Sequence, residues 1–276
     1  MDALEPRALY QGFLPDHGQR AFVWKYAESI GGRRPRHFHG EPELNLVVRG
    51  SAVFGVGSRA VSVSAGELLA FPAGQDHALL EASSDLYLYA IGLDAAFSRE
   101  VLGLRCEPVV PLHVRLAPEE LEAVSERAAA IVDKSDVSEL GAELWERAHW
   151  LGRRSAPRGR HAPHVLTRRA LKLLESRPEL GLDSMAHELR THSSEISRYF
   201  HRDVGMPLVR YRTRLRLLSF IRLLGDQGER DLTYAASAAG FGSYSQCHRA
   251  FRVELGCAPR RFFSGIREQM QLTYAP

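Results

Sequence analysis

Three histidines and one glutamate in the first third of the chain have the residue types and spacing of a metal site. His37 and His39 are two residues apart, so on a strand both side chains face the same way, and Glu43 and His77 come from neighbouring turns and strands. Three imidazoles and a carboxylate are an adequate ligand set for Zn, Ni, Mn or Fe. The four residues are therefore candidate metal ligands. The alternative is a metal-free role, in which they line a pocket for an organic ligand or stabilise the fold.

Four aromatic side chains in the same region are candidates for an effector pocket: Phe38, Phe54, Phe71 and Tyr89. Small-molecule pockets are lined mainly by apolar and aromatic side chains, with a few polar groups that fix the ligand. We expect a small effector to bind near these rings and the histidines. Plain core packing is the alternative for each ring.

A different kind of candidate site lies between residues 182 and 204. Leu182, Met185, Ala186 and Leu189 form the inner face of a short helix, and a tight turn follows at residues 190–192. Ser193 is the expected cap of the next helix, whose inner face repeats every four residues at Ile196, Phe200 and Val204. This leaves one polar face for a DNA major groove: Ser194, Glu195, Ser197, Arg198, His201 and Arg202.

A similar arrangement occurs about 50 residues later. A small-residue helix around residues 235–239 ends at Gly240, where a glycine permits the left-handed turn between two helices. Ser243 and Gln246 have the spacing of a capping box. Cys247, Phe251 and Leu255 then point inward, and the outward residues are Ser245, Gln246, His248, Arg249 and Arg252.

Two arginines are the best candidates for reading bases, because a guanidinium can pair bidentately with guanine O6 and N7. These are Arg198 and Arg249, one in each segment. Contact with phosphate alone, or with a carboxylate of the protein, is the alternative for both. The serines and Gln246 are weaker candidates for base edges or phosphates.

The charge distribution agrees with a DNA-binding second half. Residues 1–159 carry 17 Lys and Arg against 22 Asp and Glu, a net charge of −5, whereas residues 160–276 carry 19 against 11, a net charge of +8. A basic excess confined to one half favours a polyanionic partner, although a solvated basic surface explains it too.

The spacing of apolar residues changes along the chain, and it predicts which secondary-structure elements position the candidate residues. Seven short runs between residues 22 and 93 resemble strands and are punctuated by glycine, proline and polar residues at intervals of roughly 8 to 12 residues, as in an all-β barrel or sandwich. Residues 118–150 then show helical spacing, typical of two helices, and a linker rich in Pro, Gly and Arg follows at 153–163. We predict an α+β chain of two domains: 1–152, with the barrel at about 20–95 and helices at about 117–152, and an all-α domain at 164–276.

Composition excludes several classes of protein. No run reaches the roughly 18 apolar residues of a membrane span, and the start of the chain lacks a basic segment followed by an apolar one, so we expect a cytoplasmic protein without a membrane partner. The three cysteines, Cys106, Cys247 and Cys257, are far apart and indicate neither a disulfide framework nor a thiolate zinc site.

Residues 164–265 resemble the DNA-binding domain of the AraC/XylS family of transcriptional regulators. The second segment matches the family signature at Gly240, Phe241, Ser245, Arg249, Phe251, Arg252, Gly256, Pro259 and Phe262. The first segment matches at Arg198, Phe200, Gly205 and Pro207. Cys247 departs from the usual Phe, which removes volume from the core of the second unit.

The first domain resembles the cupin barrel that many of these regulators carry. One cupin motif is matched by Gly31, His37, His39, Glu43 and Gly50, and the other by Gly66, Pro72, Gly74 and His77, with Glu81 in place of the usual Asn. The two resemblances imply a cupin barrel and a double helix-turn-helix domain, double-stranded DNA and RNA polymerase as partners, and a metal or small molecule as effector.

Two features of the sequence have an alternative interpretation. The helices at 118–152 are a place for self-association into a homodimer, and packing on the barrel is the alternative. A metal-dependent cupin enzyme, a dioxygenase or isomerase with an accessory helical domain, is the alternative function. The double helix-turn-helix argues against it, because a metabolic enzyme has no use for a basic DNA-reading domain.

Overall fold

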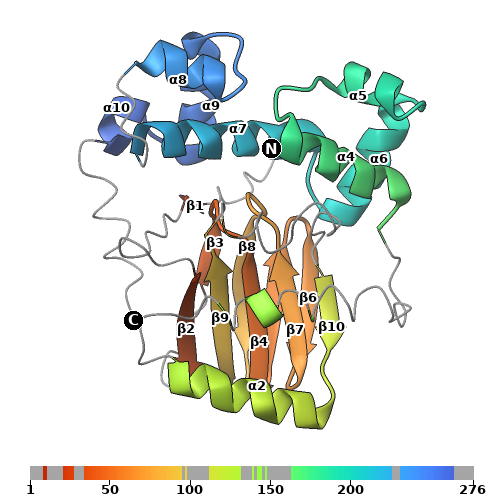
Figure 1. Cartoon of the computed structure of the whole chain (residues 1–276), viewed down its shortest axis with the longest axis vertical. Helices are drawn as coiled ribbons and strands as arrows, with labels where there is room; N and C mark the ends of the chain where they lie inside the picture. Colours follow the sequence, from red (N-terminus) through yellow and green to blue (C-terminus); the bar gives the residue numbers. More distant parts are fainter. Residues whose placement is uncertain are drawn as a thin grey trace, which may run out of the picture.

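The computed structural model describes a β-rich first half and a helical second half (Figure 1). The described residues are 9–10, 21–27, 34–94, 97, 112–131, 139, 142–144, 147, 163–225 and 231–263. Almost all of the predicted linker lies outside these residues. No helix in the described ranges is long and apolar enough to cross a membrane.

Two five-stranded sheets form the barrel, with strand orders β1-β3-β8-β5-β6 and β10-β7-β4-β9-β2. Their strands are β1 (Leu9–Tyr10), β2 (Ala21–Ala27), β3 (Arg34–Phe38), β4 (Glu43–Arg49), β5 (Ser51–Val56), β6 (Arg59–Ser64), β7 (Glu67–Phe71), β8 (His77–Ala82), β9 (Tyr87–Leu93) and β10 (Leu112–Arg115). All neighbouring strands pair antiparallel except β1 and β3. Seven strands, β2 and β4–β9, confirm the seven runs of the sequence, and β3 contains His37, which was expected on a strand, whereas β1 and β10 were not predicted.

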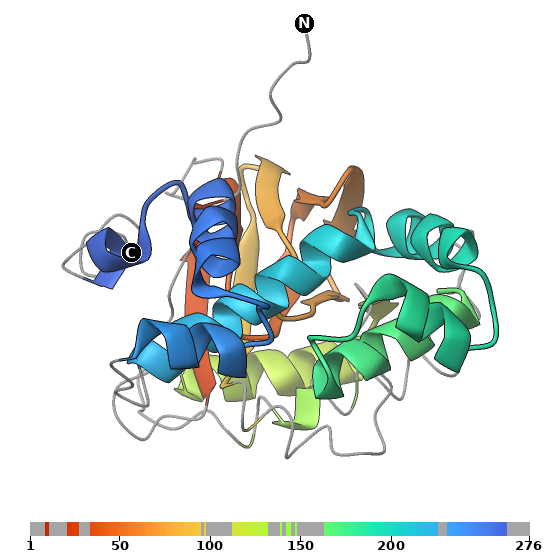
Figure 2. The same cartoon turned by 90° about the horizontal axis from the view of Figure 1, so that it is seen from above.

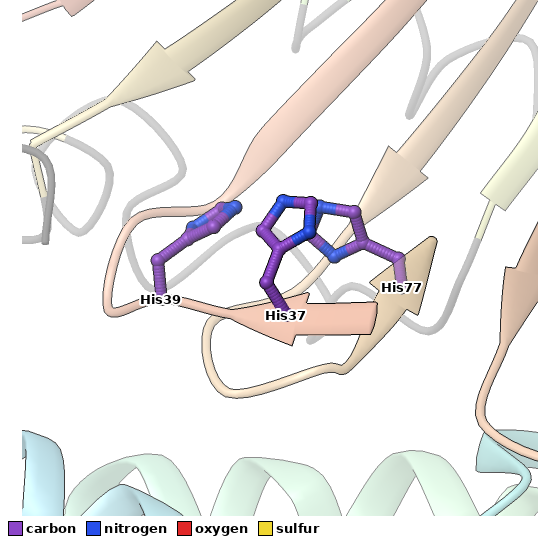
Figure 3. Close-up of side chains that lie close together, drawn as sticks. All are labelled: His37, His39 and His77. Atoms are coloured by element: carbon purple, nitrogen blue, oxygen red, sulfur yellow. The ribbon is translucent and has the colours of Figure 1, made fainter. Parts of the chain in front are cut away.

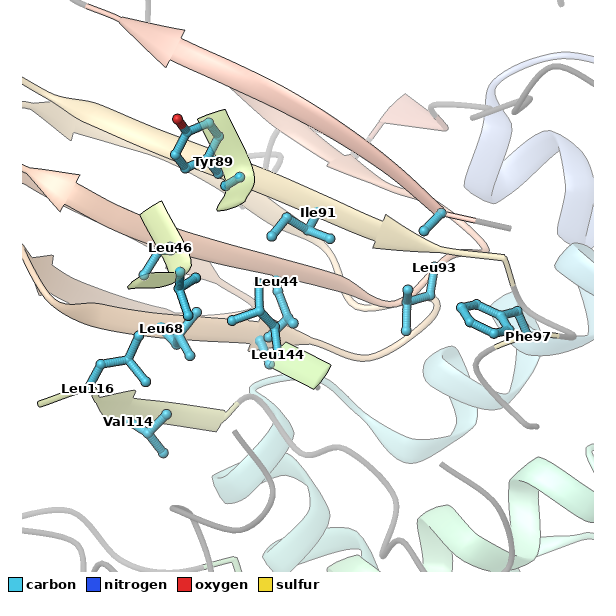
Figure 4. Packing of buried hydrophobic residues seen from close by; sticks show 14 residues of the cluster. Leu44, Leu46, Leu68, Tyr89, Ile91, Leu93, Phe97, Val114, Leu116 and Leu144 are labelled. Atoms are coloured by element: carbon cyan, nitrogen blue, oxygen red, sulfur yellow. The ribbon is translucent and has the colours of Figure 1, made fainter. Parts of the chain in front are cut away.

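The second sheet is buried on both faces, because the barrel core covers one face and helices cover the other. Along β4 and β9, Leu44, Leu46, Tyr89 and Ile91 face outward into a cluster that includes Leu144 (Figure 4). Helix α2 (Pro118–Ile131) adds Val124 and Ala128 to this cluster. The apolar stripe of the predicted helices therefore packs on the barrel. The second of them is described only at residues 139, 142–144 and 147.

The second half contains two helix-turn-helix units on either side of a long helix (Figure 2). Its helices are α4 (Val165–Ser176), α5 (Leu182–Glu188), α6 (Ser193–Val204), α7 (Leu208–Gly225), α8 (Leu232–Ala238), α9 (Tyr244–Leu255) and α10 (Pro259–Arg261). Both α6 and α9 end at a glycine in the left-handed conformation, Gly205 and Gly256. Each unit has its own core, one around Ile196 and Phe200 and the other around Cys247 and Phe251.

The start of each second helix tests the predicted caps. Ser243 is the N-cap of α9 and accepts a hydrogen bond from the Gln246 amide, while the Gln246 side chain accepts one from Gly242 N–H, which confirms the capping pair. The predicted Ser193 cap was wrong: His192 is the N-cap of α6, and the Ser193 hydroxyl instead donates to Asp183. The turn before α6 is one residue shorter than expected.

Candidate effector site and DNA-reading helices

A small cavity lies inside the barrel, between the two sheets. Strand alternation determines its lining, because residues two apart on one strand share a face. The lining residues are Trp24, Tyr26, His37, Glu43, Asn45, Phe54, His77, Leu79, Leu88 and Ala90. One wall is thus polar and built from imidazoles, a carboxylate and an amide, while the others are aromatic or aliphatic.

The three predicted histidines come together at this polar wall (Figure 3). His37, His39 and His77 are all buried, and each offers a ring nitrogen within 4.8 Å of the others. The ring centroids of His37 and His77 are 4.3 Å apart, and those of His39 and His77 are 5.0 Å apart. Glu43 adjoins the group, with Oε2 at 3.0 Å from His39 Nε2 and 3.8 Å from His77 Nε2.

Backbone carbonyls accept hydrogen bonds from Nδ1 of two of the imidazoles. His39 Nδ1 lies 2.7 Å from the Glu41 carbonyl and His77 Nδ1 lies 3.1 Å from the Gln75 carbonyl, so in each ring Nδ1 carries a proton and donates it. In His77 this leaves Nε2 unprotonated and directed toward the site, whereas His39 Nε2 donates to Glu43 and must lose that proton before it binds a metal. His77 Nε2 is buried and has no hydrogen-bond partner within the described part of the chain.

The electrostatics of the wall also suit a cation. Burial lowers the pKa of His77 to about 4, so its ring is neutral and able to ligate at neutral pH. Burial alone would raise the pKa of Glu43, but His77 and the hydrogen bond from His39 bring it well below its ordinary value. The remaining oxygen of Glu43 accepts a hydrogen bond from Asn45 Nδ2 at 2.8 Å. The donor set therefore fits a divalent transition metal.

The predicted aromatic residues are distributed over three environments. Phe54 lines the cavity, and Phe71 stacks on the His77 ring with centroids 4.3 Å apart. Phe38 and Tyr89 were predicted to line the effector pocket, but both face away from the cavity. Phe38 lies between His37 and His39, whose side chains face inward, so alternation turns the Phe38 ring outward. Tyr89 belongs to the cluster on the outer face of its sheet. Trp24, Tyr26 and Asn45 line the cavity and were not predicted, although each alternates with outward residues on β2 or β4.

The first recognition helix, α6, exposes Ser194, Arg198 and Arg202, while Ser197 is half-buried. The Arg198 guanidinium lies 4.8 Å from the centre of the Tyr199 ring, which restrains the side chain and leaves its charge accessible. Arg202 Nε donates to Asp203 Oδ1 at 2.7 Å. Glu195, the remaining residue predicted to contact DNA from α6, accepts a hydrogen bond from the Thr191 hydroxyl. Glu195 therefore stabilises the turn, and its negative charge does not suit a phosphate backbone.

The second recognition helix, α9, exposes Ser245, Gln246, Arg249 and Arg252, and His248 is half-buried. Within the part of the chain that the structure describes, neither the Arg249 nor the Arg252 guanidinium makes a hydrogen bond or ion pair. Cys247 is fully buried beside Phe220 and Phe251, and burial raises its pKa to about 12, so the thiol packs as a small apolar group. The core of the second unit therefore holds Cys247 in place of the larger Phe that is usual at this position.

Two family models match separate parts of the chain. Residues 29–91 match the cupin domain, and residues 185–265 match a helix-turn-helix domain. No curated protein sequence matches the chain.

Solved structures with a similar arrangement include ToxT from Vibrio cholerae O395. It aligns over 93% of this chain and 98% of its own, at 14% identity and a TM-score of 0.48. ToxT of V. cholerae strain SCE256 with a bound unsaturated fatty acid aligns over 88% and 93%, also at 14% and 0.48. The C-terminal domain of AraT, a response regulator from Geobacillus stearothermophilus, aligns over 42% of this chain and 91% of its own, at 20% and 0.34.

All these TM-scores are below 0.5, so the assignment depends on the two domain matches. They occur on one chain, with the cupin domain first and the helix-turn-helix domain second. The chain therefore carries a cupin domain followed by a helix-turn-helix domain.

Proposed function

We propose that this protein is a transcriptional regulator of AraC/XylS type, that it binds DNA sequence-specifically, and that a metal ion or small molecule in the cupin cavity controls its binding. One observation carries the proposal: the barrel contains a cavity with a histidine wall, and two helix-turn-helix units with exposed arginines are packed against the same barrel. DNA binding and effector binding are thus joined in one molecule.

In the proposed complex, α6 and α9 enter successive major grooves on one face of the DNA, about 34 Å apart. Arg198 and Arg249 read bases, because each is exposed and lies on the outward face of its helix. Arg252 contacts phosphate, and Arg202 contacts phosphate from its position beside Asp203. The other proposed contacts, to base edges or phosphates, are Ser194, Ser197, Ser245, Gln246 and His248.

In the barrel, the residues proposed to hold a Zn, Ni, Mn or Fe ion are His37, His39 and His77, with Glu43 as a further ligand or as a balancing charge. A bound divalent ion would supply a fixed positive charge and open coordination positions for a small ligand. Asn45 orients Glu43, and the Glu41 and Gln75 carbonyls orient the imidazoles. Phe54, Trp24 and Tyr26 give the ligand an aromatic surface.

Metal analysis of protein purified without chelator tests the barrel site. We expect about one equivalent of metal in the wild type and less than a tenth of an equivalent in His77→Gln. His113→Gln is the matched control, because His113 pairs with Glu67 at 3.1 Å and does not line the cavity. Less than a tenth of an equivalent in the wild type would contradict the metal and leave an organic effector as the proposal.

Other partners follow from the role of a regulator. We propose a homodimer and contact with RNA polymerase, and the cytoplasm as the compartment, because the proposed DNA partner is there. No enzymatic role is part of the proposal, since the cavity accompanies two DNA-reading helices. Sedimentation of the purified chain with and without operator DNA tests the dimer, and a single monomeric species in both samples would contradict it.

A further inference from the structure

The barrel and the DNA-binding half meet across a buried network of charges. Arg214, on α7, has only 1% of its side chain exposed. Its Nη1 lies 2.9 Å from Asp76 Oδ1, on the loop before β8, and its Nε lies 3.0 Å from Glu254 Oε2, on α9. The exposed fractions of the two carboxylates are 8% and 6%. One guanidinium thus joins the barrel to the second recognition helix.

The other oxygen of Asp76 leads to the first recognition helix. Arg36 Nη1 lies 2.6 Å from Asp76 Oδ2 and 2.8 Å from the Gly57 carbonyl, in the turn between β5 and β6. Next to that turn, the Ser58 amide donates to the carbonyl of Gly205 at 3.0 Å. Gly205 is the residue that ends α6. Asp76 is therefore the branch point of two routes, one to α6 and one to α9.

The same branch point adjoins the wall of the cavity. Asp76 directly precedes His77, and the Arg214 guanidinium lies 4.4 Å from the centre of the Phe38 ring. Phe38 is the residue between His37 and His39. Any shift of the histidine wall thus moves a residue that contacts the network. Figure 1 shows the corresponding arrangement of the elements, with α7 across one end of the barrel.

Burial makes the network sensitive to such shifts. Charges removed from water are stable only when opposite charges and hydrogen bonds stay in place, and breaking one pair leaves its partner uncompensated. Arg36, Asp76, Arg214 and Glu254 alternate in sign, so displacement of Asp76 weakens the contacts of both arginines at once. A small movement at the cavity therefore has a large electrostatic cost at the interface.

We infer that Asp76 is the positioning residue through which the occupancy of the cupin cavity is transmitted to both recognition helices. The inference deepens the proposed function and rests on it for the identity of the signal. The connection between Asp76 and the two helices, however, exists whether or not a metal binds. The two parts are therefore tested separately.

The first arm uses metal-free full-length protein and hydrogen exchange read by mass spectrometry. The reporters are peptides containing the Ser58 amide, on the α6 route, and the Gly256 amide at the end of α9. In Asp76→Asn we expect both to exchange about tenfold or more faster than in the wild type. In Arg36→Gln only the Ser58 peptide should change. Glu67→Gln is the matched control, a barrel carboxylate paired with Arg115 and His113 outside the interface.

The second arm adds NiCl₂ as the probe. In the wild type we expect Ni²⁺ to change exchange at both reporters, and in Asp76→Asn to bind with an affinity within about threefold of wild type while changing neither reporter. Unchanged reporters in metal-free Asp76→Asn and Arg36→Gln would overturn the inference, as would a full Ni²⁺ response in Asp76→Asn. If the wild type binds no Ni²⁺, the metal role in the proposed function fails, and the first arm alone decides the inference.

Discussion

Gly57 lies against the end of α6 in the first helix-turn-helix unit, and replacing it with alanine tests that contact. A Cβ atom at this position would lie 2.6 Å from the Gly205 carbonyl oxygen and 2.8 Å from the carbonyl carbon. Real Cβ atoms essentially never approach another atom this closely, and both partners here are backbone. Gly57→Ala must therefore separate the turn from the end of α6.

Two costs contribute to the loss of stability. Gly57 has a φ of +55°, so alanine adds about 1 to 2 kcal/mol of local strain. Separation also removes the Ser58–Gly205 hydrogen bond and the bond from Arg59 to the Asp203 carbonyl, each worth about 1 kcal/mol. Gly66→Ala is the matched control, because its φ is +83° but the nearest atom to its Cβ is 3.6 Å away, so it suffers strain alone.

Urea unfolding followed by circular dichroism compares the two variants. We expect Gly57→Ala to lose about 1 to 3 kcal/mol more of the free energy of unfolding than Gly66→Ala, and its Ser58 amide to exchange faster. Equal losses, within about 0.5 kcal/mol, together with an unchanged Ser58 amide, would refute the contact between the turn and α6.

Three further predictions concern the DNA-binding half. Arg249→Ala should weaken specific DNA binding by about 1 to 3 kcal/mol and relax one base position in a fluorescence-anisotropy titration, whereas Arg169→Ala, an exposed charge on α4, should not relax it. Cys247→Phe should lower stability by about 1 to 3 kcal/mol in urea, because its core is already filled, and a gain would contradict this packing. Burial alone would raise the pKa of Asp203, but hydrogen bonds from Arg202, Thr167 and the His164 amide bring it below its ordinary 3.8. The ionised Asp203 therefore stabilises the fold above pH 3.8, and this stabilisation is lost as the pH falls through the lower pKa of the folded state. In Asp203→Asn the free energy of unfolding should decrease less steeply with falling pH than in the wild type, and an unchanged decrease would contradict this role.

Much of the fold follows from local patterns in the sequence. Short runs separated by turn residues predicted seven strands. A spacing of four predicted the inner faces of α6 and α9, because in each helix one face is buried and the other is exposed to solvent. The histidine wall was predictable for the same reason, since His37 and His39 share a face. Short strands such as β1 and β10 carry too few residues to show a period.

The errors occurred where both faces of an element are buried. Tyr89 was placed in the pocket because β9 is apolar on both sides, and alternation alone does not say which side is the cavity. Nothing in the sequence indicates that Arg214 is buried. It stands among Arg210, Arg212 and Arg216, a pattern typical of a solvated basic helix. Its partners Asp76 and Glu254 are 138 and 40 residues away, so only the packing of the barrel on α7 reveals them.

In the proposed function, α6 and α9 read DNA together. Hydroxyl-radical footprinting on a site selected from random DNA tests it most directly, with wild type, Arg198→Ala and Arg249→Ala compared. We predict two protected segments about one helical turn apart on one face of the duplex, with each variant losing sequence preference in one segment only. A single protected segment, or equal protection of unrelated DNA, would contradict the claim.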